Sequence, residues 1–260
     1  MVTFVLLLPL IITVLTSFKP AGEVITAVPT LIPHRFSLQN YIDLFTIQEF
    51  PRYLLNSSLV ASCTAVLTLI IASLAACALV WMRFPGKKVI LCSILFTYMF
   101  PHILLLIPLF LMCHNFNLID TKFSLVLVYL AFSLPFSTWM LQGFFESIPR
   151  ELIEASFMDG CSYRDTLLRI VIPVSLPGVG AVGIFSFVLA WGEYLFAGTL
   201  INHETNRTIA IGLQTLVGYY RTDYALLTAA STAMSLPIFV LLVAAQKYFI
   251  QGLTTGSINE

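Results

Sequence analysis

The sequence predicts an all-α integral membrane protein with about six membrane-spanning helices. Of its 260 residues, 58% are hydrophobic and only 10% are charged, whereas soluble globular proteins carry about 25% charged residues. The mean hydropathy is +0.93. Several apolar runs approach the ~20 residues that a helix needs to cross a bilayer. We therefore expect one transmembrane domain over residues 1–260, embedded in lipid.

Six apolar runs give the expected spans. The first, 1–18, has no basic segment before its apolar residues and no small-residue cleavage site after them, so we expect a retained anchor. The other expected spans are 57–82, 88–112, 123–143, 176–200 and 224–249. Prolines within three of them remove backbone donors; they are Pro101, Pro108, Pro135 and Pro237. Both broken helices around a path and ordinary kinks packed by neighbouring helices are consistent with this pattern.

Basic residues in the loops indicate the orientation of the chain in the membrane. The densest group is "RFPGKK", which places Arg83, Lys87 and Lys88 in a very short loop after the second span. Basic residues in the alternate loops are spread over longer segments. This asymmetry predicts cytoplasmic N- and C-termini, and it places residues 149–173 on the cytoplasmic side.

Residues 149–173, "PRELIEASFMDGCSYRDTLLRIVIP", concentrate charge in an otherwise apolar chain. The charged members are Arg150, Glu151, Glu154, Asp159, Arg164, Asp165 and Arg169. Pro149 suits a helix start, and Gly160 suits a left-handed stop. Ser162 with Asp165 three residues later is typical of a new helix start, and Pro173 is expected to end that helix near Ile172. The sequence predicts two short helices joined at a glycine corner.

A helical wheel of the first short helix predicts which side chains face outward. Arg150, Glu151 and Glu154 share one face, with Met158 between the two glutamates and Phe157 beside them. The residues expected to pack inward are Ile148, Leu152 and Ala155. A methionine and an aromatic ring on the charged side favour docking into a partner's pocket. An interfacial linker whose charges keep it in water is the alternative.

Other sites are weakly indicated or not expected. Glu193 is the only acid within an expected span, yet it lies about 27 Å along its helix from Ser175. It is therefore either a residue of the pore mouth or an interfacial residue that reaches water. Four histidines and five cysteines are scattered without metal-ligand spacing, so we expect no metal site. Zero net charge and the absence of a basic patch argue against nucleic acid.

The sequence also limits the kind of function. "FPGKK" lacks the first glycine and the Ser or Thr that a phosphate loop needs, so we do not expect this chain to hydrolyse ATP. No constellation for an intramembrane enzyme is visible. A self-sufficient secondary transporter or channel remains the alternative, although it predicts repeats and midplane charges that we do not find.

The charged stretch resembles the EAA loop of membrane subunits of bacterial ABC importers. That pattern runs Glu-Ala-Ala, then Asp-Gly-Ala, then Ile-x-Leu-Pro, and its matches here are Glu154, Ala155, Asp159, Gly160, Ile170 and Pro173. It departs at Ser156, Cys161 and Ile172, all of which are small or apolar substitutions. The segments "TSFKP", "NSSLVAS", "FFESIPRELIEAS", "WGEYLFAGTLI" and "GLTTGSINE" extend the resemblance to carbohydrate-uptake permeases, nearest to the second permease subunit of the maltose-transporter type.

The resemblance implies both the role of the loop and its partners. Between the fourth and fifth spans, the loop would be a coupling helix in the cleft of a cytoplasmic ATPase subunit, where Glu154 makes a polar contact and Gly160 permits the corner. The site residues would be Glu154, Ala155, Phe157, Met158, Asp159, Gly160 and Pro173. The chain would form half of a path for a sugar or related polyhydroxy solute in the bacterial cell membrane.

Further partners follow from the same resemblance. A second homologous permease, two copies of an ATPase subunit and an extracytoplasmic solute-binding protein would complete the importer. ATP would be bound by the ATPase partner, so this chain would need no cofactor of its own. The segments 19–56 and 199–223, which contain Tyr41, Tyr219 and Tyr220, would face the binding protein or form an unsupported lid.

Overall fold

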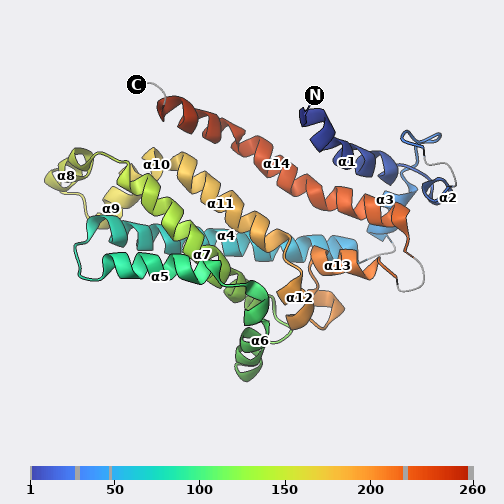
Figure 1. Ribbon diagram of the computed structural model, residues 1–260, viewed down its shortest axis with the longest axis horizontal. Helices are drawn as coiled ribbons and strands as arrows, with labels where there is room; N and C mark the ends of the chain where they lie inside the picture. Colours follow the sequence, from blue (N-terminus) through green and yellow to red (C-terminus); the bar gives the residue numbers. More distant parts are fainter. Residues whose placement is uncertain (1, 27–29, 47–48, 219–221, 257–260) are drawn as a thin grey trace. The chain divides into compact units, whose positions relative to one another are not determined.

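The computed structural model describes residues 2–26, 30–46, 49–218 and 222–256, with side chains from Leu6 to Gln246 within these ranges. Every regular element in this part of the chain is a helix (Figure 1), which confirms the all-α prediction. The chain divides into two compact units, residues 1–59 with 193–240 and residues 60–192 with 241–260. Helices α4 (Phe50–Trp81) and α14 (Tyr224–Gly256) contribute to both units. The division therefore leaves the single-domain prediction untested.

The first unit contains the chain's N-terminal segment and residues 193–240. Its further elements are α1 (Val2–Ser17), α2 (Ala21–Val24), α3 (Gln39–Thr46), α12 (Leu195–Leu200), η3 (Glu204–Asn206) and α13 (Ile209–Thr215). Asn40 fastens α3 to the end of α1, because its side-chain amide donates to the carbonyl oxygens of Ser17 and Lys19 at 2.9 and 2.8 Å. These bonds satisfy carbonyls at the end of α1 that have no partner within the helix.

Two further contacts shape the segment between α1 and α3. Tyr41 shares a 2.7 Å hydrogen bond with the hydroxyl of Ser17, so this predicted surface aromatic is partly used in packing. The backbone N–H of His34 donates to the Glu23 carboxylate at 2.8 Å. This bond, together with the Thr30 hydroxyl and the charge of Lys19, holds the pKa of Glu23 below its usual range. Tyr219 and Tyr220 lie outside the described residues.

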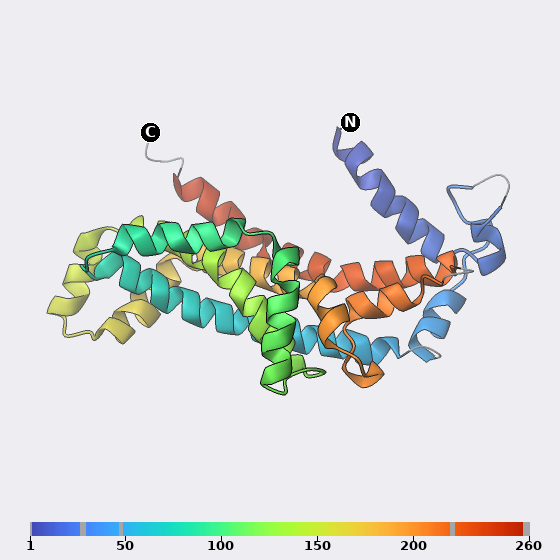
Figure 2. The same ribbon diagram turned by 60° about the horizontal axis from the view of Figure 1, so that its bottom comes forward.

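The second unit is a bundle in which α7 (Lys122–Glu146) contacts both α5 (Lys87–Met99) and α11 (Leu176–Trp191), as Figures 1 and 2 show. Buried hydroxyl pairs link its helices: Thr68 of α4 lies 2.7 Å from Ser133 of α7. Ser137 of α7 lies 3.4 Å from Ser186 of α11. Paired hydroxyls of this kind are favourable between membrane helices because neither group is left without a partner in hydrocarbon.

The expected spans correspond to apolar helices of three kinds. Three helices are long and apolar enough to cross a membrane alone: Phe50–Trp81, Lys122–Glu146 and Tyr224–Gln246. Two further spans are bent pairs, Lys87–Met99 with His102–Asn115 and Tyr163–Val174 with Leu176–Trp191. Leu6–Ser17 is a shorter apolar helix. The six-span prediction is consistent with these elements, but two of the spans are not single straight helices.

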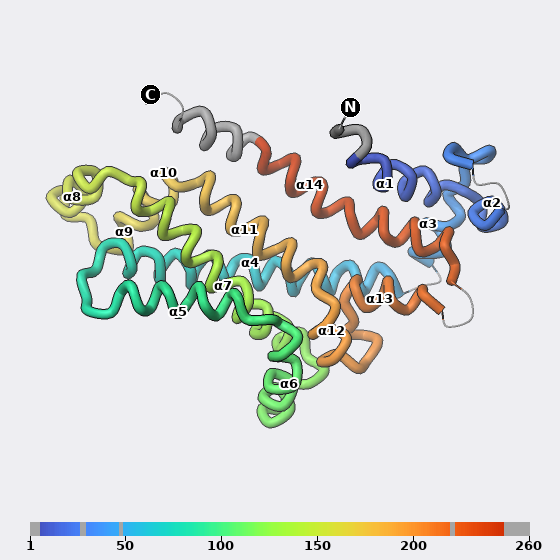
Figure 3. Tube along the Cα trace, viewed as in Figure 1, coloured from blue at the N-terminus to red at the C-terminus, as the bar shows by residue number. Residues whose placement is uncertain are grey.

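The prolines have different effects in different helices. The third expected span, 88–112, is broken after Phe100, and the chain turns by 93° at Pro101 (Figure 3). The turn leads through η1 (His102–Leu105) into α6 (Leu106–Asn115), which includes Pro108. The His102 ring stacks on Phe132 of α7 at 4.2 Å, and this contact holds the turn. By contrast, α7 and α14 continue through Pro135 and Pro237.

Candidate functional site

The charged stretch folds as the predicted pair of short helices at one end of the second unit. The first is α8 (Arg150–Met158), which begins directly after Pro149. Pro149 is extended, with φ −54° and ψ 132°, and its carbonyl accepts the N–H of Leu152 at 3.2 Å. Proline is well tolerated at a helix start because its missing N–H is not needed there. We call the segment 149–173 the polar corner.

Gly160 ends α8 in the way the sequence predicted. Its φ is +81°, in the left-handed region that glycine adopts without a steric penalty. The N–H of Cys161 donates to the Ser156 carbonyl at 3.0 Å, and the N–H of Gly160 donates to the Phe157 carbonyl at 3.0 Å. This pair of bonds is the Schellman arrangement, which satisfies the last carbonyls of a helix.

The second helix of the polar corner starts at the predicted cap. Ser162 Oγ accepts the N–H of Asp165 at 3.2 Å and donates to the Asp165 carboxylate at 2.5 Å. α9 (Tyr163–Thr166) then passes into a π-helical turn, η2 (Leu167–Val171), and into α10 (Ile172–Val174). The prediction that Pro173 ends this helix near Ile172 is wrong by two residues. Pro173 lies in the first turn of α10, where it needs no intrahelical donor, and the chain bends by 86° at Ser175.

The buried face of α8 differs from the predicted one. Leu152 and Ala155 are exposed, whereas Ile153 and Ser156 are 8% and 3% exposed. Ile148 is buried, as expected. Ile153 joins an apolar core with Phe145 of α7, and with residues of α4, η2 and α11. The prediction was wrong because tertiary contacts decide the buried face: Ile153 packs into this core, and the Ser156 hydroxyl has buried hydrogen-bond partners.

Ser156 and Thr166 fasten the two short helices together. Ser156 Oγ donates to the Ile153 carbonyl at 2.7 Å and lies 2.9 Å from Thr166 Oγ1. Since a hydroxyl carries a single proton, Thr166 is the donor in the bond between them. Thr166 is fully buried, and sequence reasoning did not identify it. Only its place four residues after the Ser162 cap could have indicated a buried position.

Phe157 is also placed differently from the prediction. It is half-buried, packs against the apolar core, and meets the ring of Tyr163 edge-on at 4.9 Å. It therefore supports the polar corner from within and does not stand on its outward side. The predicted site residues that are exposed are Glu154, Ala155, Met158, Asp159, Gly160 and Pro173. Met158 is 88% exposed, the most exposed of the large apolar side chains of this capped corner.

Glu154 lines a cleft of about 710 Å³ within the second unit. It is also lined by Arg150 of α8, Glu146 of α7, Arg83 of the loop after α4 and Lys87, the first residue of α5. The sequence predicts orientation from "RFPGKK", and the fold also brings Arg83 and Lys87 of this stretch into the cleft that Glu154 lines. The cleft therefore offers charges of both signs to a partner, next to the exposed Met158.

Glu193 lies outside any helix, because α11 ends at Trp191 and α12 begins at Leu195. The expectation of one helix over 176–200 was wrong. The Glu193 carboxylate accepts the N–H groups of Phe196 and Ala197 at 2.9 and 3.1 Å. An acid at a helix N-terminus satisfies free donors and interacts favourably with the helix dipole. A place at the pore mouth stays a prediction.

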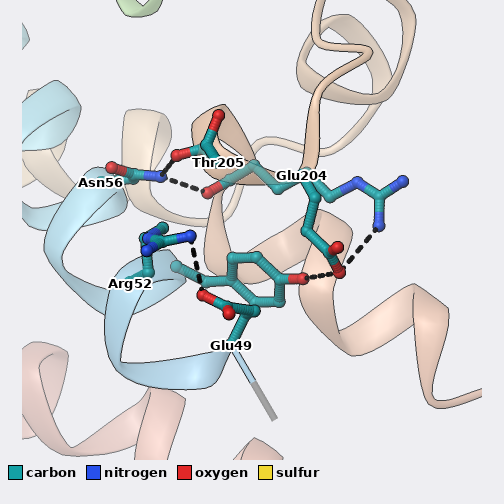
Figure 4. Close-up of polar contacts among 7 residues, drawn as sticks. Glu49, Arg52, Asn56, Glu204 and Thr205 are labelled. Atoms are coloured by element: carbon teal, nitrogen blue, oxygen red, sulfur yellow. Dashed lines mark hydrogen bonds and ion pairs between the residues drawn. The ribbon is translucent and has the colours of Figure 1, made fainter.

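A second polar cluster lies in the first unit, where the start of α4 meets residues 204–209 (Figure 4). The Asn56 amide donates to the carbonyls of Thr205 and Arg207, both at 2.9 Å. The Tyr53 hydroxyl donates to Glu204 at 2.9 Å. α4 begins at Phe50, seven residues before the expected span at 57, and this added length carries these anchoring groups.

Comparisons with known proteins agree with the resemblance read from the residues. Residues 64–255 match the family model described as "Binding-protein-dependent transport system inner membrane component". The inner membrane ABC transporter permease protein YcjP of Escherichia coli is 33% identical, over 97% of this chain and 91% of its own length. The sulfoquinovosyl glycerol transport system permease protein SmoH of Agrobacterium fabrum is 36% identical, over 97% and 89%.

A solved structure shares the fold. A chain of a bacterial ABC transporter involved in the import of the acidic polysaccharide alginate aligns with a TM-score of 0.83 at 22% identity, covering 95% of this chain and 92% of that one. One conclusion follows from the all-helical architecture, from the family match along residues 64–255 and from relatives that align over nearly the whole chain. This chain belongs to the family of inner membrane components of binding-protein-dependent transport systems, and it is an ABC importer permease.

Proposed function

We propose that this permease forms half of the translocation path for a sugar or related polyhydroxy solute, and that its polar corner docks into a separate ATPase subunit. The solute class is supported by the names of relatives. These include SmoH, a diacetylchitobiose uptake permease of Streptomyces coelicolor, and the trehalose/maltose permease MalG of Thermococcus litoralis. The last is 32% identical over 88% of this chain.

The observation that carries the docking proposal is the exposure of Met158 on a corner that is otherwise internally fastened. Met158 is 88% exposed. The end of its helix is fixed by a Schellman arrangement, by the Ser162 cap and by the Ser156–Thr166 hydrogen bond. Its side chain therefore cannot become buried within this chain. A rigid apolar projection with charge around it is the chemistry of a buried anchor at a protein interface. Glu154 and the adjacent mixed-charge cleft would set the register of the partner.

The mechanism follows from this rigidity. ATP binding and hydrolysis would take place in the partner, which would grip Met158 and move the polar corner as a body. Because Ile153 and Phe157 are packed into the core shared by α4, α7 and α11, displacement of the corner would be passed to membrane helices without bending α8. The path would then open alternately to the two sides of the membrane.

The wider assembly is part of the same proposal. A second homologous permease would supply the other half of the path, and two ATPase subunits would dock below. An extracytoplasmic solute-binding protein would deliver cargo; a structural neighbour is described as an alginate transporter in complex with an alginate pentasaccharide-bound periplasmic protein. The basic loop after α4 supports cytoplasmic termini.

Two substitutions of Gly160 test docking separately from folding. A Cβ added at Gly160 meets nothing within 4 Å in this chain, so alanine and tryptophan there carry the same backbone strain at φ +81°. We expect Gly160→Ala to retain most ATPase association and Gly160→Trp to abolish it, because only tryptophan adds bulk where the partner would sit. Co-purification of the ATPase from membranes measures this. Equal association by the two variants would contradict docking at the corner.

Substitutions of Met158 provide a matched comparison. Met158→Glu should abolish ATPase association and solute uptake, while Met158→Leu should retain both, because leucine keeps the apolar volume. Insertion of both variants is checked by their yield in membranes. Proteoliposomes that hold this chain alone should show no uptake; uptake without an ATPase would instead support a self-sufficient secondary transporter.

A further inference from the structure

An apolar groove of about 590 Å³ runs along α4 in the second unit. One wall is the face of α4 from Leu69 to Trp81, with Met82 directly after it, and the other is formed by the second helix of the polar corner and by α11. The twelve steps from Leu69 to Trp81 correspond to about 18 Å at a rise of ~1.5 Å per residue. The groove is thus longer than one leaflet's share, about 15 Å, of a ~30 Å hydrocarbon core.

One end of the groove is polar and aromatic. Arg164 and Tyr163 line it there, and the Tyr163 ring lies 6.4 Å from that of Trp81, the last residue of α4. Tryptophan and tyrosine are enriched where membrane helices meet the lipid headgroups. Arg164 is exposed, and among the described residues it forms no ion pair with a carboxylate. An exposed cation that forms no ion pair within the described part of the chain therefore lies at the headgroup end of an apolar groove.

We propose that this groove binds an anionic phospholipid, with one acyl chain along α4 and the phosphate at Arg164. Basic positions between membrane helices at the cytoplasmic side are suited to anionic headgroups. A partner's apolar helix fits less well, because it would leave the exposed Arg164 at the end of the groove without an anion. This lipid site depends on the proposed function in one respect only, namely that the proposed function places Arg164 at the cytoplasmic leaflet.

The position of the groove gives the lipid a role. Tyr163, Arg164 and Leu167 belong to the polar corner, whereas the opposite wall belongs to α4. A bound lipid would contact both walls and would stabilise the packing of the polar corner against α4. The stability of the polar corner would thus depend on the lipid composition of the surrounding bilayer.

Native mass spectrometry of the full chain, released from detergent micelles with added phosphatidylglycerol or phosphatidylcholine, tests the headgroup. Phosphatidylglycerol should be preferred, and Arg164→Gln should weaken its binding about fivefold, as expected for one basic residue near an anionic lipid. Arg169→Gln is the matched control, because Arg169 pairs with Asp165 at 3.4 Å and does not line the groove. Equal binding of the two lipids, or equal losses in the two variants, would overturn the proposal.

A photo-crosslinking residue at position 74 in native membranes tests the acyl chain. Leu74 lines the groove, and Val66, exposed on α4 outside it, is the control position. Phospholipid adducts at position 74 that are richer in anionic lipid than those at position 66 would support the site. A protein adduct at position 74, or the same lipid composition at both, would overturn it. Neither experiment requires an ATPase or transport, so the lipid site and the proposed function can fail independently.

Discussion

At the residue scale, the polar corner depends on a few side chains that satisfy buried groups. Ser156 and Thr166 are 3% and 0% exposed and are joined by a 2.9 Å bond. A buried hydroxyl that loses its partner costs more than the bond itself contributes, because it was desolvated on folding and is then left unsatisfied. The corner's geometry therefore depends on a pair of residues and not on either hydroxyl alone.

A double-mutant cycle at this pair tests that statement. Ser156→Ala should destabilise the corner by about 1–3 kcal/mol, because it strands the Thr166 hydroxyl. Adding Thr166→Val removes the hydroxyl that was left without a partner, and it should restore much of the stability that Ser156→Ala loses. The rate of limited proteolysis of the corner in detergent measures each variant. If the double variant loses as much as the two single variants combined, the hydroxyls are not coupled.

At the element scale, α7 and α11 approach each other closely because Gly178 has no side chain. A Cβ built at this position would lie 2.3 Å from Cδ2 of Phe144, so the ring would have to move. Gly180, two residues along the same helix, has open space around the equivalent position. The two glycines are therefore alike in the sequence and different in their packing.

Alanine substitutions separate the two glycines. Gly178→Ala should destabilise the α7–α11 contact by about 1–3 kcal/mol through overpacking. Gly180→Ala should be neutral or stabilising by up to about 1 kcal/mol, since alanine is the better helix former. The temperature at which the purified chain loses half its monodisperse fraction in detergent is the measurement. A loss of equal size in both variants would assign the effect to the helix backbone and not to Phe144.

The same scale shows which features can be predicted from sequence. The Gly160 stop and the Ser162 cap were predictable because their signals are local: a left-handed residue and a cap need only their own neighbours. The inward face of α8 was not, because Leu152 and Ile153 are alike in hydropathy, and tertiary contacts decide which one is buried. Pro101 breaks its helix, whereas α7 continues through Pro135 because it packs against neighbouring helices. Next to Pro135, the ring centroid of Phe136 lies 4.6 Å from that of Phe185 in α11.

At the scale of the whole molecule, the distribution of basic residues along the sequence predicts the orientation in the membrane. Arg83 and Lys87 line the cleft beside α8 in the second unit. Exposed Arg35 lies in the first unit, on the long segment between α1 and α3. The density of basic residues in short loops sets the orientation of a membrane protein. We therefore expect the polar corner and Arg35 to be exposed on opposite sides of the membrane.

Accessibility to a membrane-impermeant maleimide tests this orientation. In a background with Cys161→Ser, Met158→Cys should be labelled in inverted vesicles and protected in intact spheroplasts, because the predicted orientation places the exposed Met158 in the cytoplasm. Arg35→Cys should show the opposite pattern. The unsubstituted background gives the labelling of the other four cysteines, Cys63, Cys77, Cys92 and Cys113. Labelling of position 158 from outside would reverse the orientation and would remove the polar corner from the reach of any cytoplasmic ATPase, even if the fold and the family assignment stood unchanged.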